Sequence, residues 1–323
     1  MSWMELRLDT TSEAVDWVST LLAAVGYTGE LDIQPYVTSD QTAPAASASE
    51  PEWHFTICLL FPYNAQSRSQ TEQIMQRLSP LQRTGMINEP QLAVVEEKPA
   101  HLADSAQGHR IGKRFIVLSP DAAASKDDVV LRLEKSLAFG SGLHPATIAC
   151  LRLLERQSLE GMQALDLGSG SGILSVAMAK LGAQVLALDN DRVAVEATQA
   201  AVRCNAVEQQ VTAMAGSLGR GSDLGHWLSG ETVNDVPTIQ PIANFDLIVA
   251  NILARVHITL APDFRLALRQ TKAHAGVLIT GGFTTDYEDE VHLALAEAGF
   301  EKVDCERIDE WVVLAHQLKP KLV

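Results

Sequence analysis

The stretch ALDLGSGSG, residues 164–172, decides the fold. An apolar strand runs into three glycines, Gly168, Gly170 and Gly172, which alternate with serine. Such a turn lets the backbone approach a ligand closely, and it opens a helix whose N-terminus faces that ligand. The alternative is an ordinary strand-to-helix turn, which does not need three alternating glycines. The motif therefore predicts a ligand site at the end of this strand.

The spacing of the glycines distinguishes between two classes of cofactor. The dinucleotide fingerprint needs G-x-G-x-x-G, but its third glycine position is occupied here by Ile173. The chain instead reads D-x-G-x-G-x-G from Asp166 to Gly172, the spacing associated with methyltransferases that use S-adenosyl-L-methionine (AdoMet). The motif favours an AdoMet site over a nicotinamide site.

Strands and helices alternate on both sides of this turn. Strands are expected at residues 164–167, 185–189, up to Met214, 245–251, 276–282, 301–307 and 311–317, with helices between them. This alternation predicts an α/β fold with a doubly wound, mostly parallel sheet covered on both faces, over residues 131–323. The Gly- and Pro-containing residues 217–243 are expected to be a surface insertion.

The first hundred residues follow another order. Residues 3–9, 30–37, 53–61 and 91–96 are strand-like, and apolar residues have helical spacing at 12–25 and 68–83. The order β-α-β-β-α-β predicts a small α+β ferredoxin-like domain over residues 1–98, with an Ala-, Ser- and Pro-rich surface loop at 38–52. Residues 99–130 are weakly patterned and are expected to be a linker, with one strand-like stretch at 114–120.

Asp189 ends the strand that follows the glycine turn. A carboxylate at this position can accept hydrogen bonds from both ribose hydroxyls of a nucleoside. Alone, Asp189 is equally compatible with a helix cap or a solvated turn, but its distance from the glycine turn favours ribose binding. Asp191 is expected to cap the helix that begins at Arg192.

Asn251 ends the strand FDLIVAN, residues 245–251. Its amide oxygen can accept a hydrogen bond from an incoming amine and aim the lone pair of that amine at a methyl group. The alternative role is a cap of the next helix. Adenine methyltransferases carry Asn-Pro-Pro and an aromatic residue here, whereas this chain has Asn251-Ile252-Leu253-Ala254, so methylation of a base is not expected.

The loop FGSGLHPAT, residues 139–147, precedes the glycine turn. Glycines on both sides of Ser141 permit a tight loop able to fold over a cofactor, and Thr147 offers it a hydroxyl. We therefore include Phe139, Ser141 and Thr147 among the predicted cofactor contacts. His144 invites a catalytic interpretation, but a histidine before proline in a loop is more often structural or exposed.

Composition excludes several functions. Lys and Arg number 25 against 40 Asp and Glu, a net charge of −15, so binding to nucleic acid by neutralising phosphates is not expected. The four cysteines lie far apart in sequence, without the spacing of a metal or redox site. The N-terminus lacks a signal-peptide pattern, and no apolar run approaches the ~18 residues of a membrane span. We expect a cytoplasmic protein that holds no metal.

Together these motifs resemble a known family. The runs AFGSGLHPAT, DLGSGSGIL, LDND, FDLIVANILA, ITGGF and Glu310-Trp311 resemble the ribosomal protein methyltransferases called PrmA, which modify protein eleven of the large ribosomal subunit. The resemblance implies AdoMet as cofactor and trimethylation of lysine side chains and an N-terminal amine. It also implies that Thr147, Gly168, Asp189 and Asn251 contact AdoMet. The N-terminal WMELRLDT and the order of elements fit that family's substrate-recognition domain.

The chain departs from the family pattern in several places. The family loop usually reads GTG with two threonines after the histidine, whereas Ser141 and Ala146-Thr147 stand here. A tryptophan-rich stretch expected around residues 98–112 is missing, and the segments 38–52 and 217–243 are unusual. These departures bear on substrate selection more than on cofactor binding.

The expected reaction is in-line transfer of a methyl group to a neutral amine, with Asn251 as the catalytic residue that orients the amine. Two other functions stay open: a methyltransferase for another protein or a small molecule, and a non-enzymatic AdoMet-binding module. A basic large-subunit ribosomal protein is the expected partner.

Overall fold

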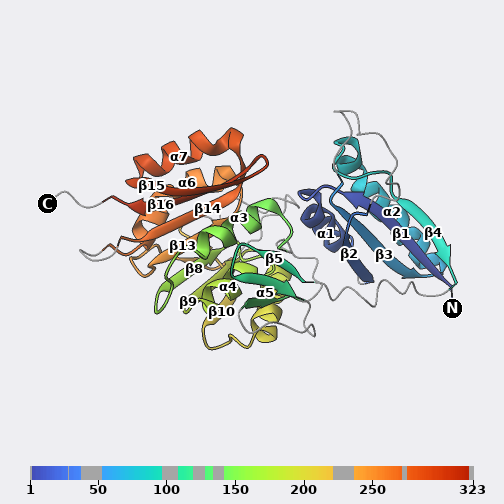
Figure 1. Cartoon of the computed structure of the whole chain (residues 1–323), viewed down its shortest axis with the longest axis horizontal. Coiled ribbons are helices and arrows are strands. Elements are labelled where there is room, and N and C mark those ends of the chain that lie inside the picture. The colour runs from blue at the N-terminus through green and yellow to red at the C-terminus, as the bar shows by residue number, and fades with distance from the viewer. Residues whose placement is uncertain are drawn as a thin grey trace. The chain divides into compact units, whose positions relative to one another are not determined.

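The structure is a computed structural model that describes residues 2–27, 29–37, 53–96, 108–118, 128–133, 142–220, 236–270 and 275–319. The described residues before Gly108 form one compact unit, and those from Gly108 onward form a second (Figure 1). Among the described residues, no helix combines the length and the apolar character needed to cross a bilayer.

The first unit is a four-stranded antiparallel sheet with two helices. Its elements are β1 (Trp3–Thr10), α1 (Ala14–Ala24), β2 (Glu30–Pro35), β3 (Phe55–Pro62), α2 (Ala65–Arg83) and β4 (Gln91–Val95). The sheet order β2-β3-β1-β4 is the ferredoxin-like arrangement that the sequence predicts. Alternate residues of β1, such as Leu6 and Leu8, pack against apolar residues of the two helices, such as Val18 and Ile74. The loop predicted at 38–52 lies outside the described residues.

The second unit contains the predicted mostly parallel sheet. In sheet order, its strands are β10 (Val211–Ala215), β9 (Gln184–Asp189), β8 (Gln163–Leu167), β13 (Leu247–Asn251), β14 (Val277–Thr284), β16 (Trp311–Leu318) and β15 (Phe300–Ile308). The first five are parallel, and β16 is antiparallel to both of its neighbours. The predicted α/β fold is therefore confirmed.

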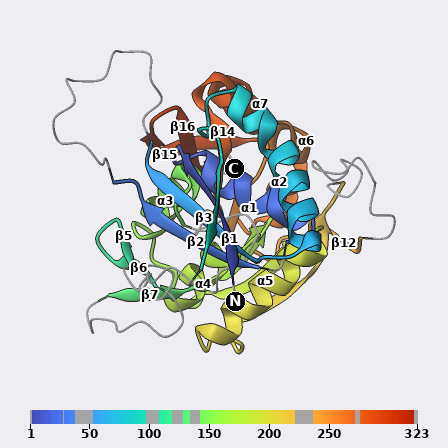
Figure 2. The same cartoon turned by 90° about the vertical axis from the view of Figure 1, so that its right-hand side faces the viewer.

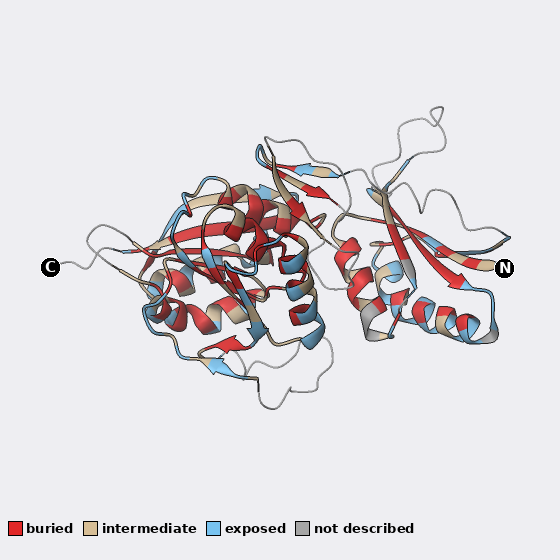
Figure 3. Ribbon diagram, turned by 90° about the horizontal axis from the view of Figure 1, so that it is seen from below, coloured by how far each residue is buried: buried red, intermediate tan, exposed pale blue. Residues whose placement is uncertain are grey.

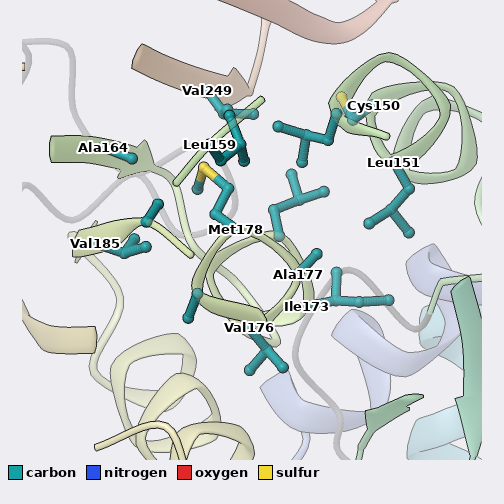
Figure 4. Packing of buried hydrophobic residues seen from close by; sticks show 14 of the residues in the cluster. Cys150, Leu151, Leu159, Ala164, Ile173, Val176, Ala177, Met178, Val185 and Val249 are labelled. Atoms are coloured by element: carbon teal, nitrogen blue, oxygen red, sulfur yellow. The ribbon is translucent and has the colours of Figure 1, made fainter. Parts of the chain in front are cut away.

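Helices cover both faces of this sheet, which explains the nearly continuous apolar strands. On β13, Val249 faces the core under α3 (Pro145–Leu154), α4 (Ile173–Lys180) and α5 (Arg192–Cys204). Its neighbour Ala250 faces the core under α6 (Ala254–Ala267) and α7 (Glu288–Glu297). Figure 3 shows the buried residues on the central strands and inner helix faces. Figure 4 shows α4 residues such as Met178 and Val176 among their neighbours.

The linker predicted over residues 99–130 is corrected in its described part. Residues there form β5 (His109–Ile111) and β6 (Phe115–Leu118), which join β7 (Val129–Arg132) in a three-stranded sheet (Figure 2). Phe115 and Leu131 of this sheet are fully buried in the core of the second unit. Strands of three or four residues are too short for an apolar period to show in the sequence, although the stretch at 114–120 coincides with β6.

The predicted surface insertion at 217–243 is only partly described. Its two ends form β11 (Ser217–Leu218) and β12 (Thr238–Ile239), which pair with each other in parallel. Residues 221–235 between them lie outside the described residues. The pairing of β11 with β12 brings the two ends of the insertion side by side.

Candidate functional site

The glycine turn joins β8 to α4 and has the backbone that only glycine adopts easily. Gly168, Gly170 and Gly172 have φ values of +78°, +53° and +80°. A Cβ on Gly168 would lie 2.4 Å from Cγ2 of Ile252, and one on Gly172 would lie 2.8 Å from the Cα of Thr198. The glycines are thus required both by conformation and by the close approach of neighbouring segments.

Asp189 lies at the carboxyl end of β9, directly beside this turn. Its Oδ2 accepts a hydrogen bond from the backbone N–H of Gly170 at 2.9 Å, and its Oδ1 accepts one from the N–H of Asp191 at 2.9 Å. These two backbone amides orient the Asp189 carboxylate beside the turn. Asp191 caps α5 by accepting the N–H of Val193, as the sequence predicts.

Asn251 ends β13 at the same carboxyl edge of the sheet. Its Nδ2 donates to Oγ1 of Thr147 in the first turn of α3, with 3.3 Å between the two atoms. Its Oδ1 is buried and has no hydrogen-bond partner among the residues that the structure describes. The cap of α6 is Leu253, so the alternative role of Asn251 as a helix cap does not apply. An orphaned amide oxygen at this edge is an acceptor available to a ligand.

Two glycines of β14 make room for Asn251. A Cβ on Gly281 would lie 3.2 Å from the Asn251 Oδ1 atom, and a Cβ on Gly282 would lie 2.6 Å from the carbonyl oxygen of Ile252. His257 of α6 fixes the same corner, because its Nε2 lies 2.8 Å from the Gly281 oxygen and 3.0 Å from the Ile252 oxygen. Burial lowers the pKa of His257 to about 4, so the ring is neutral at pH 7. The sequence does not reveal this role of His257, because it depends on contacts across 24 residues.

His144 has a structural role at the start of α3. Its Nδ1 accepts the N–H of Ala146 at 3.1 Å and so caps the helix. The ring is fully buried edge-on against Trp311, with 4.4 Å between ring centroids, and burial lowers its pKa to about 4. Trp311 begins β16 and is 8% exposed, and within the described ranges its indole N–H has no hydrogen-bond partner. The sequence analysis singles out the pair Glu310-Trp311 but does not indicate that Trp311 packs against His144.

Asp166, the first residue of the glycine motif, is fully buried beneath the turn. Its Oδ2 accepts the Ser175 hydroxyl at 2.5 Å, and none of the described residues hydrogen-bonds to its Oδ1. Burial raises the pKa of Asp166 to about 7, and the nearby Asp189 charge adds to this rise, while the Ser175 bond opposes it. This carboxyl group changes its protonation near neutral pH.

The structure brings most of the predicted site residues to one edge of the sheet. The parallel strands β8, β9 and β13 end there with the glycine turn, Asp189 and Asn251, and α3 adds Thr147. Open α/β sheets bind ligands outside these carboxyl ends. A carboxylate beside a close-approach glycine turn and an orphaned amide oxygen fit a nucleoside that carries an amino-acid moiety, which is the chemistry of AdoMet. The predicted contacts Phe139 and Ser141 lie outside the described residues.

Comparison with known proteins gives a consistent result over nearly the whole chain. The family described as "Ribosomal protein L11 methyltransferase (PrmA)" matches residues 2–319. A protein named ribosomal protein L11 methyltransferase from Chloroflexus aurantiacus is 39% identical, over 98% of each chain. The protein of the same name from Herpetosiphon aurantiacus is 37% identical, over 98% of this chain and 99% of the other.

A solved structure agrees with these relatives. The ribosomal protein L11 methylase from Lactobacillus delbrueckii subsp. bulgaricus is 28% identical and has a TM-score of 0.51. The match covers 66% of this chain and 99% of that one.

Proposed function

This chain belongs to the family of ribosomal protein L11 methyltransferases, and from that premise we propose that it transfers methyl groups from AdoMet to amines of ribosomal protein L11. As a member of the family it is an AdoMet-dependent methyltransferase. The observation that carries the proposal for the site is the contact between Asn251 and Thr147 where the strands end. It leaves the Asn251 Oδ1 atom buried and without a partner among the described residues.

We assign the cofactor contacts to the glycine turn, Asp189 and Thr147. The turn formed by Gly168, Gly170 and Gly172 brings backbone close to the ligand, and the Asp189 carboxylate accepts the two ribose hydroxyls. The bonds from the Gly170 and Asp191 amides hold that carboxylate in place before the ligand arrives. Phe139 and Ser141 remain predicted contacts from the adjoining loop. When bound, AdoMet supplies a methyl group on a sulfonium centre.

We assign the orientation of the amine to Asn251. Its Oδ1 accepts an N–H of the incoming amine and so aims the lone pair of the nitrogen at the transferable methyl group, with about 3–3.5 Å between reacting atoms. The Nδ2 bond to Thr147 fixes which end of the amide faces the amine. Proximity and orientation are the main contributions that the protein makes to such a transfer.

The amine must be neutral when it reacts. A free lysine has a pKa of about 10.4, so its neutral form at pH 7 lies roughly 4–5 kcal/mol higher in free energy unless the site lowers that pKa by desolvation. His144 and His257, the histidines described at this corner, have pKa values lowered to about 4 and are weak bases. We therefore propose that water accepts the proton.

The test is a substrate screen with methyl-labelled AdoMet. The proposal predicts that purified ribosomal protein L11 takes up label and that other basic ribosomal proteins and small amines do not. Label on another protein or on a small molecule would instead support the alternative, a methyltransferase of the same fold with a different substrate. Binding of AdoMet without any transfer would point to a non-enzymatic module.

We also propose that the protein acts in the cytoplasm and without a direct nucleic-acid contact. All four cysteines are free thiols, which fits a reducing compartment. The net charge of −15 opposes binding to phosphate groups and suits a basic protein substrate.

A further inference from the structure

We infer that His109, the first residue of β5, is a positioning residue that holds the turn before α3 and thereby the contact between Thr147 and Asn251. The inference rests on the proposed function only for its kinetic consequence. His109 lies 33 residues before Gly142, and its Nε2 lies 2.9 Å from the Gly142 carbonyl oxygen. A carbonyl oxygen only accepts, so Nε2 carries the proton and donates it to this bond.

Close packing also restricts the position of the Gly142 turn, in addition to this hydrogen bond. Gly142 has a φ of +84°, and a Cβ there would lie 2.8 Å from Cδ1 of Ile173 and 3.3 Å from both His109 Nε2 and Val117 Cγ2. The turn is therefore packed between the three-stranded sheet and Ile173, the first residue of α4 after the glycine turn. The hydrogen bond from His109 adds a directional contact to this packing.

The three-stranded sheet is bonded to the rest of the second unit at two other points, the ends of α3 and α5. His109 therefore projects from a sheet that is held in place. The Glu155 carboxylate, at the end of α3, accepts the backbone N–H groups of Lys113 and Arg114. The Asn205 side chain, at the end of α5, accepts the Arg132 N–H at 2.9 Å and donates to the Arg132 oxygen at 2.6 Å. These bonds hold the turn between β5 and β6 and the end of β7.

A short path leads from Gly142 to the reacting edge. Two residues after Gly142, His144 caps α3 by accepting the Ala146 N–H. One residue later in that first turn, Thr147 accepts the Asn251 amide. A displacement of the Gly142 carbonyl would shift the first turn of α3 and with it the orientation of Asn251. Misplacement of a reacting group by about 1 Å can lower a rate by as much as a hundredfold.

The role of His109 does not depend on its charge. Burial lowers the pKa of His109, which favours the neutral ring. Nε2 carries a proton in the imidazolium as well as in this neutral tautomer, so the bond to Gly142 is available in both states. Glutamine places an amide N–H at a similar reach and should replace the ring, whereas leucine fills similar space without a donor.

The experiment compares His109→Leu, His109→Gln and a matched control, Arg110→Gln, in the full-length protein. Arg110 is the next residue of β5, is exposed and pairs with Asp128. With L11 as substrate, we expect H109L to lower kcat about tenfold, with less than about threefold change in the KM for L11 or the Kd for AdoMet. H109Q and R110Q should retain wild-type kcat. An H109L variant with wild-type kcat, or an equal loss in H109Q, would overturn the inference.

A second readout does not require activity. Hydrogen exchange of the Ala146 and Ile148 amides, both bonded to His144, reports the order of the first turn of α3. We expect exchange there to be about tenfold faster in H109L and unchanged in H109Q and R110Q. Unchanged exchange in H109L would contradict the role of His109 even if L11 proved not to be the substrate. A wild-type protein that leaves L11 unmodified would contradict the proposed function alone.

Discussion

The Asn251 amide nitrogen donates to the Thr147 hydroxyl across 104 residues of sequence, and the Asn251 carbonyl oxygen is left without a hydrogen-bond partner in the described part of the chain. Thr147 therefore helps to determine the orientation of the Asn251 side chain. A buried amide oxygen without a hydrogen-bond partner destabilises the folded protein until a ligand supplies a donor. The substrate amine is the donor in our account.

The first prediction concerns this pair. Asn251→Ala should lower kcat about a hundredfold while the Kd for AdoMet changes much less, because the amide orients the amine. Thr147→Val should lower kcat by about tenfold. Thr147→Ser should keep the wild-type kcat, since serine retains the hydroxyl that accepts the Asn251 amide. Steady-state kinetics and calorimetry measure both quantities. Full activity in N251A and T147V would show that the amine is oriented by other groups.

The second prediction separates two neighbouring carboxylates. Asp189→Ala should weaken AdoMet binding about a hundredfold, because two charge-assisted hydrogen bonds to the ribose and the support of Gly170 disappear together. Asp191→Ala is the matched control. It removes a helix cap, so it should lower the free energy of unfolding by about 1 kcal/mol and leave the Kd for AdoMet within about threefold of wild type. Equal binding defects in the two variants would argue against a specific role for Asp189.

The third prediction tests the glycine turn for space as well as conformation. Gly161 and Gly168 have similar backbones, with φ of +73° and +78°, but a Cβ on Gly161 would have no described atom within 4 Å. Gly161→Ala should therefore lower the free energy of unfolding by only about 1–2 kcal/mol, the cost of a Cβ on a left-handed backbone. Gly168→Ala adds the clash with Ile252 and should cost about 1–3 kcal/mol more, with loss of AdoMet binding. Urea unfolding of both variants gives the comparison, and equal costs would contradict the close packing of the turn against Ile252.

The fourth prediction follows from the raised pKa of Asp166. Its pKa is about 7 in the folded protein against a usual value of 3.8, so the folded state holds the proton more tightly. The stabilisation is complete below pH 3.8 and is lost as the pH rises toward and through 7. Between pH 5 and pH 8 the loss amounts to about 2–3 kcal/mol.

Asp166→Asn removes this titration. The free energy of unfolding of the wild type should fall relative to that of D166N as the pH rises from 5 to 8. Urea unfolding of the ligand-free proteins across this range measures the difference. Parallel curves for the two proteins would show that Asp166 does not titrate in this window.

Much of the fold follows from the sequence because each element there is long enough to show its period. The strands around ALDLGSGSG and the strand FDLIVAN agree with β8 and β13 to within two residues. The helices α4 and α5 begin at Ile173 and Arg192, where the sequence expects them. Local signals such as the Asp191 cap depend on neighbouring residues and are therefore readable without a structure.

Features that depend on contacts between distant segments are not readable in this way. The sequence gives no sign that His109 bonds Gly142 or that His257 holds the corner at Gly281, because each contact joins elements that pack only in the folded chain. The orphaned oxygen of Asn251 and the burial of His144 against Trp311 are likewise properties of packing. The short strands β5 and β7 escape detection because too few residues carry the pattern.

The most direct test of the account is the intact mass of purified ribosomal protein L11 after incubation with this protein and AdoMet. We predict mass gains in steps of about 14 Da, one for each methyl group added to an amine, and a much smaller gain with the Asp189→Ala variant at the same AdoMet concentration. The number of steps gives the number of methyl groups transferred. An unchanged mass of L11, with AdoMet binding by the wild-type protein still measurable by calorimetry, would contradict L11 as the substrate.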